Sequence, residues 1–303
     1  MHPPPSMIIF TVLTGLGMGM IAWVGLGLGD WDHNFGWVAG FLALVIGGIG
    51  GVASVGHLGR PDRAWRAFTQ WRSSWLSREA CLMVTAKVTF TLYLALWLLF
   101  GIEVSVLGWL AAFLAMATVY ATAMIYAQLR TVPRWSGTPT PFLFVVLSLA
   151  GGLLATGSIK GFTGGDVPVV YSLCWLLVAA GSTIWWTQQA AGARRGLHGS
   201  SMETATGLGN IGRVKMLEPP HTGSNYLLKE MAYQVGRDKA FQLRKVGAFL
   251  GFILPLVLSL LALAMGPWTL LIALVCHLAG MFALRWLFFA EAEHVQALYY
   301  GMR

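Results

Sequence analysis

The sequence predicts an all-α integral membrane protein, a single domain of eight transmembrane helices over residues 1–303. Of these 303 residues, 56% are hydrophobic and only 11% are charged, whereas a soluble domain carries roughly a quarter charged residues. The mean hydropathy of +0.67 is more than one water-soluble core would produce. The apolar residues also form long runs without the polar–apolar alternation of barrel strands, so we expect helices rather than a barrel.

Eight apolar runs are long enough to be membrane spans, since a helix needs about 20 apolar residues to cross lipid. They cover residues 7–28, 37–56, 80–101, 105–127, 141–158, 169–190, 246–265 and 268–290. Gly266 and Pro267 form a turn signal, which predicts a tight hairpin between the last two helices. Met1–Ser6 contains no Lys or Arg, so this segment does not resemble a signal peptide and we expect the first helix to be retained.

The basic residues predict the orientation in the membrane. Seventeen of the 20 lie in segments on the side of the N-terminus, whereas the opposite side carries only Lys160, and Lys87 and Arg285 lie inside apolar runs. Basic segments stay in the cytoplasm, so both termini are predicted to be cytoplasmic, in the cytoplasmic (inner) membrane. The net charge of +8 is then a topology signal, and we expect contacts with membrane lipid but none with nucleic acid.

Two further features concern partners and metals. The segment 191–245 is unusually long and basic, with a short amphipathic helix expected near Asn225–Met231, and we interpret it as a cytoplasmic docking loop. Cys81, Cys174 and Cys276 lie in three separate apolar runs without a C-x-x-C motif. We therefore expect no metal site and no iron–sulfur cluster in this chain.

The stretch from His57 to Glu79 carries the chemically suggestive residues. The second helix is predicted to end at His57 and the third to begin near Glu79, whose carboxylate suits a helix N-terminus. Histidine exchanges a proton near neutral pH, and Glu79 could pass that proton on. Arg60 and Arg63 would balance negative charge, and Trp75 offers a flat apolar wall.

A second segment returns to the same membrane face, where Tyr126 places a phenol at the end of the fourth helix. Each of these residues alone also fits an ordinary membrane interface, where arginines meet lipid phosphates and aromatic residues form a belt. Their combination on one face favours a functional site.

The motifs of these two segments resemble a known family. H-L-G-x-P-x-R-A from His57 to Ala64, L-S-x-E from Leu76 to Glu79, and Y-x-x-x-x-T-V-P-x-W from Tyr126 to Trp135 are similar to the membrane anchor subunits of the dimethyl sulfoxide reductase type (DmsC-like, related to NrfD-like proteins). The resemblance in motifs runs from about residue 47 to residue 141, and beyond it rests on hydropathy.

This resemblance implies an anchor that holds an iron–sulfur electron-transfer subunit and a molybdopterin catalytic subunit at the membrane. It implies a quinone site in this chain, without haem, with His57, Arg63 and Glu79 at the positions tied to quinol binding and its protons. Well-known reductase anchors of the family place the histidine face outside the cytoplasm, whereas the basic residues here place it inside. A cytoplasmic member resembles the anchors of cytoplasmic sulfite dehydrogenases, which implies sulfite oxidation to sulfate with quinone reduction.

Other functions stay open at this point. The chain could anchor a terminal reductase of the dimethyl sulfoxide reductase type, which oxidises quinol. A small-solute transporter would be expected to show inverted repeats and charges near the midplane, for which Lys87 and Arg285 are the strong basic candidates. A haem-bearing cytochrome anchor would need paired histidines, such as His57 with His294.

Overall fold

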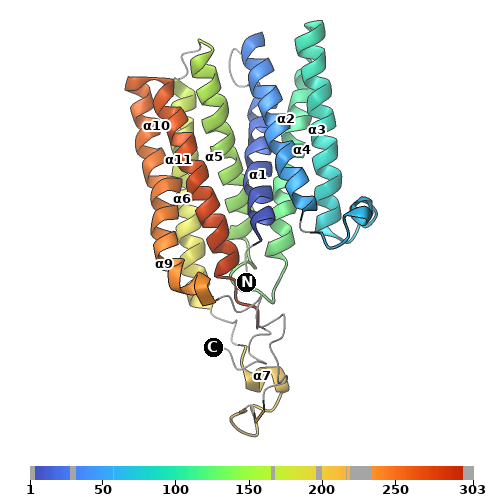
Figure 1. Ribbon diagram of the computed structural model, residues 1–303, viewed down its shortest axis with the longest axis vertical. Coiled ribbons are helices and arrows are strands. Elements are labelled where there is room, and N and C mark those ends of the chain that lie inside the picture. Colours follow the sequence, from blue (N-terminus) through green and yellow to red (C-terminus); the bar gives the residue numbers. More distant parts are fainter. Residues whose placement is uncertain are drawn as a thin grey trace.

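The computed structural model describes residues 4–27, 32–56, 58–164, 168–195, 200–215, 217–218 and 234–295. These residues form helices and connecting segments without a strand, and eight helical segments are long and apolar enough to cross a membrane. The chain runs alternately up and down, so that α1 begins and α11 ends at the same end of the bundle (Figure 1). That end is called the N-side below.

The first four spans form one half of the bundle and the last four form the other. The helices are α1 (Pro5–Leu26), α2 (His33–Val55), α3 (Trp75–Phe100), α4 (Ser105–Ala127), α5 (Pro139–Phe162), α6 (Pro168–Arg195), the continuous run α9 (Gln234–Ala248), η2 (Phe249–Ile253) and α10 (Leu254–Met265), and α11 (Pro267–Ala290). A short 3-10 helix, η1 (Pro61–Phe68), links α2 to α3, and α7 (Met202–Thr206) lies beyond the N-side of the bundle (Figure 1).

Helix α1 is the centre of the bundle, because it packs against α2, α4 and α5. Met18, Ile21 and Val24 on this helix are almost fully buried, whereas α2 presents Phe41 and Val52 outward, as expected for a face in lipid. Close packing of α1 on α2 needs glycine at Gly17, where an added Cβ would lie 2.5 Å from the backbone nitrogen of Gly47. Small residues at such contacts are typical of membrane helices.

Several helices are longer than their apolar runs. Ser74 caps α3, because its hydroxyl accepts from the Ser77 N–H at 3.5 Å, so α3 begins at Trp75 and Glu79 lies a full turn inside the helix rather than at its N-terminus. Helix α6 extends to Arg195 and α9 begins at Gln234, which shortens the predicted loop 191–245 at both ends. Gly266 with a φ of 82° makes the tight turn between α10 and α11.

Candidate functional site

The predicted site residues lie at the N-side, at the ends of α2, α3 and α4. His57 lies outside the described residues, between Gly56, which ends α2, and Leu58. Arg60 and Arg63 lie on or beside η1, where both are exposed and pair with Asp62 at 3.4 and 3.8 Å. No contact joins either arginine to Glu79 within the described part of the chain.

Glu79 is the buried acid of this region. Its side chain is 4% exposed and points from α3 toward α4, where the hydroxyl of Thr122 donates a hydrogen bond to Glu79 Oε1. The same hydroxyl also contacts the carbonyl oxygen of Thr118 at 3.0 Å. Glu79 has no ion-pair partner among the described residues. A buried carboxyl group without a neutralising cation favours its protonated form.

Trp75 lies one helical turn before Glu79, at the start of α3. Its indole contacts the Tyr120 ring edge-on at a centroid distance of 6.0 Å, and the Arg78 guanidinium lies 4.4 Å from the Trp75 ring centroid. The structure therefore places Trp75 and Glu79 beside the same helix, α4. Thr122, the partner of Glu79, was not predicted, although its four-residue spacing from Tyr126 puts both side chains on one face of α4.

Tyr126 lies one turn beyond Thr122, but its ring is buried in an aromatic cluster rather than against the η1 segment. This aromatic cluster comprises Tyr126, Trp135, Phe144, Phe288 and Phe289. The rings come from α4, the α4–α5 connection, α5 and α11, so the cluster joins the two halves of the bundle. Among the described residues, Tyr126 has no hydrogen bond with Glu79.

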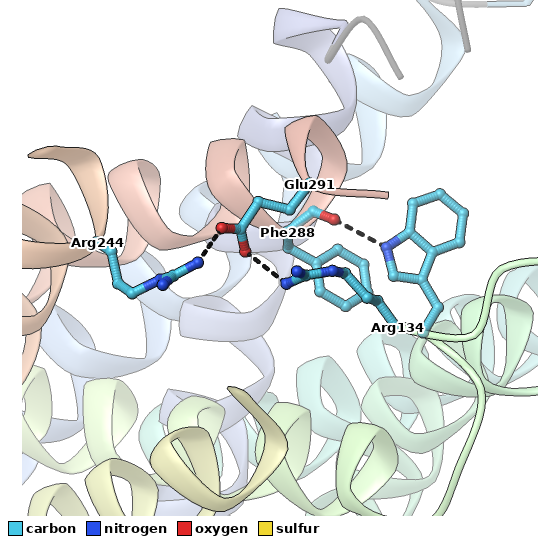
Figure 2. Close-up of polar contacts among 5 residues, drawn as sticks. Arg134, Arg244, Phe288 and Glu291 are labelled. Carbon is cyan, nitrogen blue, oxygen red and sulfur yellow. Dashed lines mark hydrogen bonds and ion pairs between the residues drawn. The ribbon is translucent and has the colours of Figure 1, made fainter. Parts of the chain in front are cut away.

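A polar network that the sequence did not predict closes the N-side of the second half (Figure 2). Glu291, just after α11, pairs with Arg134 at 3.1 Å and with Arg244 of α9, and its side chain is 9% exposed. The Trp135 indole N–H donates to the carbonyl oxygen of Phe288 at 2.8 Å. The network ties the α4–α5 connection, α9 and α11 together, and Glu291 is 157 residues from Arg134.

The three polar residues predicted inside apolar runs lie in different parts of the bundle. Lys87 of α3 donates to the carbonyl oxygen of Gly47 on α2 at 2.8 Å. His277 and Arg285 of α11 line a cavity between α1, α5 and α11. No group of three or more His, Cys, Asp or Glu side chains that could hold a metal ion occurs in the described ranges.

These observations define a multi-pass membrane protein whose polar side chains gather mainly at one end of a helical bundle. Residues 1–207 match the family model described as the DMSO reductase anchor subunit (DmsC), and the chain belongs to this family. The resemblance that the motifs around His57, Glu79 and Tyr126 indicated is thereby confirmed.

Two relatives extend this finding. The third-lettered, or C, component of the sulfite dehydrogenase of Allochromatium vinosum is 31% identical to the chain, with 99% of each chain covered. The anaerobic dimethyl sulfoxide reductase chain YnfH of Escherichia coli is 30% identical over 165 residues, which are 51% of this chain and 57% of that relative. The chain is therefore an anchor subunit of an oxidoreductase complex.

Proposed function

We propose that this anchor passes electrons between a docked molybdopterin enzyme and the membrane quinone pool, with the quinone head group near Glu79. The observation that carries the proposal is the buried carboxyl group of Glu79, which accepts a hydrogen bond from Thr122 and has no ion pair among the described residues. Quinone reduction takes up protons as well as electrons. A carboxyl group in this position can deliver or accept a proton at a bound quinone oxygen.

The neighbouring predicted residues take supporting roles in this proposal. His57, between α2 and η1, would exchange a hydrogen bond and a proton with the quinone head group. Arg60 and Arg63 would supply positive charge close to the ring, where preorganised charge favours the reduced form. Trp75 would form an apolar wall beside Glu79, and Tyr126 would close the site toward the aromatic cluster.

The partners in this proposal are an iron–sulfur subunit and a molybdopterin catalytic subunit at the N-side. The segment between α6 and α9 would serve as their docking loop, and α7 within it lies beyond the bundle at that end (Figure 1). We propose that this end faces the cytoplasm and that the protein lies in the inner membrane, because 17 of 20 basic residues lie on this side.

Sulfite oxidation to sulfate with quinone reduction is the favoured reaction of the complex. It is supported by the relative from the Allochromatium vinosum sulfite dehydrogenase, which aligns over 99% of both chains. A quinol-oxidising terminal reductase is the second candidate, supported by the relative named a dimethyl sulfoxide reductase chain, which covers 51% of this chain.

The test is quinone-linked turnover of the purified complex. Sulfite-dependent reduction of decylubiquinone would be compared with reduction of ferricyanide, which accepts electrons from the catalytic subunits without the quinone site. Glu79→Gln should lower decylubiquinone turnover by roughly 100-fold and leave ferricyanide turnover unchanged. Thr122→Val, which removes the hydrogen-bond donor, should cause a smaller loss in the same assay.

Thr118→Val is the matched control, because the Thr118 hydroxyl lies one turn away on α4 and bonds only the Leu114 carbonyl oxygen, at 2.8 Å. This variant should behave as the wild type. Full decylubiquinone turnover in an assembled Glu79→Gln complex would disprove the proposed site. Quinol-dependent reduction of dimethyl sulfoxide without sulfite oxidation would instead identify the reductase.

A further inference from the structure

A second polar site lies inside the bundle, away from Glu79. It is a cavity of about 340 Å³, open on one side, between α1, α5 and α11. Its apolar walls include Phe144, Leu147, Leu278 and Met281. The polar side chains that line it are Thr11, Ser148, His277 and Arg285. Ionisable residues within membrane helices are costly and usually serve a function, which points to a bound ligand here.

His277 lies near the middle of α11 and is 1% exposed. Its Nδ1 lies 2.8 Å from the carbonyl oxygen of Gly251, in the π-helical turn η2, which changes the carbonyl pattern of that helix. Because a carbonyl oxygen only accepts, Nδ1 carries the proton, and Nε2 of the neutral ring is an acceptor.

The Nε2 atom of His277 is buried and has no hydrogen-bond partner among the described residues. Gly151 of α5 also lines the cavity, and an added Cβ at that glycine would lie 3.7 Å from Nε2. The absence of a side chain at Gly151 thus leaves space on this side of the imidazole. A buried acceptor without a partner costs free energy, so the complementary ligand carries a hydrogen-bond donor.

Arg285 supplies the opposite kind of group. Its guanidinium lies 3.7 Å from the ring centroid of Phe144 and 5.5 Å from that of Phe288, and within the described ranges it has no carboxylate partner. Ser148 also has a hydroxyl without a partner in the described part of the chain. Gly15 makes room for this hydroxyl, because a Cβ there would lie 2.9 Å from Ser148 Oγ.

The spacing of these groups suits a small aromatic head group. His277 and Arg285 are two turns apart, about 12 Å along α11, and the Arg285 side chain leans back toward the start of its helix, which shortens the gap. The ligand must therefore donate at one end, accept at the other and be flat and apolar between. A lipid phosphate would pair with Arg285 but would offer no proton to Nε2.

We propose that this cavity is a second binding site for a membrane-soluble quinol, with one hydroxyl donating to His277 Nε2 and the oxygen at the far end of the ring accepting from Arg285. The Ser148 hydroxyl adds a donor, and Phe144 and Leu147 contact the ring. The inference rests on the proposed function for the supply of quinol to the complex, and on the cavity alone for its position.

Photo-crosslinking with an azido-substituted short-chain quinol tests this site in the intact purified complex. Mass spectrometry should find labelled peptides from α11 that contain Leu278 or Met281. Ser148→Ala and Gly151→Val should each reduce this labelling by at least about fivefold, in line with the loss of one hydrogen bond or of the space for the ring. Labelling of peptides from α3 should not change.

Gly151→Ala is the matched control for Gly151→Val, because its Cβ would meet Leu16 Cδ1 at an ordinary 3.4 Å. It should keep the label and the thermal stability of the wild type. Labelling of α3 alone, or equal α11 labelling in all variants, would overturn the second site and leave the proposed function standing. No labelling of the chain together with no quinone-linked turnover would overturn both.

Discussion

Asp32 shows how a single residue can organise the end of the bundle opposite the N-side. Its carboxylate caps α2 by accepting from the Phe35 N–H at 2.6 Å, and it lies 3.5 Å from the ammonium group of Lys160 on α5. The Phe35 N–H first, and then the charge of Lys160, hold the pKa of Asp32 below its ordinary value of 3.8. A carboxyl group whose folded pKa is lowered stabilises the fold while it is ionised.

Asp32→Asn should therefore lower the thermal midpoint at neutral pH, because asparagine can keep the cap but loses the charge that faces Lys160. The stabilisation by Asp32 is complete above its unfolded pKa and is lost as the pH falls from about 4 through the lower folded pKa. The melting curves of wild type and variant should thus converge in acid. Glu103→Gln, at an exposed acid on the same side, is the control, and a difference that persists below about pH 2 would contradict this account.

The helical elements are held in contact by small residues, as the α1–α2 pair illustrates. An added Cβ at Gly17 would meet backbone atoms of Gly47 at 2.5 and 2.6 Å, and a backbone cannot move away by changing rotamer. Gly48, next to Gly47 on α2, has no atom within 4 Å of its hypothetical Cβ. Glycines in the same helices thus serve different purposes.

Gly17→Ala should destabilise the protein by about 1–3 kcal/mol through overpacking. Gly48→Ala should leave stability unchanged or raise it by roughly 0.5–1 kcal/mol, because alanine favours a helix more than glycine does. Thermal unfolding of the two variants in the same detergent measures the difference. Equal midpoints would show that the α1–α2 contact is not as tight as described.

Hydropathy was enough to predict the elements but not how they pack. Eight spans follow from the need to satisfy backbone groups in lipid, and the motifs placed His57, Glu79 and Tyr126 at one end of the bundle. The partner of Glu79, Thr122, is 43 residues away, and helix neighbours depend on side-chain fit that a hydropathy pattern does not contain. For the same reason Tyr126 was expected beside the second-to-third helix loop, whereas its ring packs against Trp135 and Phe288.

At the scale of the whole molecule, Glu291 joins the two halves of the N-side. Glu291→Gln should destabilise the protein by about 1–3 kcal/mol, less than for a fully buried pair because both arginines are about one-third exposed. Hydrogen–deuterium exchange should then rise around Arg134 and Arg244. Asp62→Asn, which breaks only exposed ion pairs, should change stability by about 0–1 kcal/mol, and equal effects would contradict a linking role for Glu291.

The orientation of the whole chain decides where the docked subunits work, and it can be measured directly. In a variant without its three native cysteines, Ile211→Cys reports the exposed N-side and Glu103→Cys reports the opposite end. Because 17 of 20 basic residues lie on the N-side and basic segments stay in the cytoplasm, a membrane-impermeant maleimide should label Cys at 103 in intact cells. Cys at 211 should react only in opened or inverted membranes. The reverse pattern would place Glu79 and the docking loop outside the cytoplasm, where a cytoplasmic sulfite-oxidising partner could not reach them.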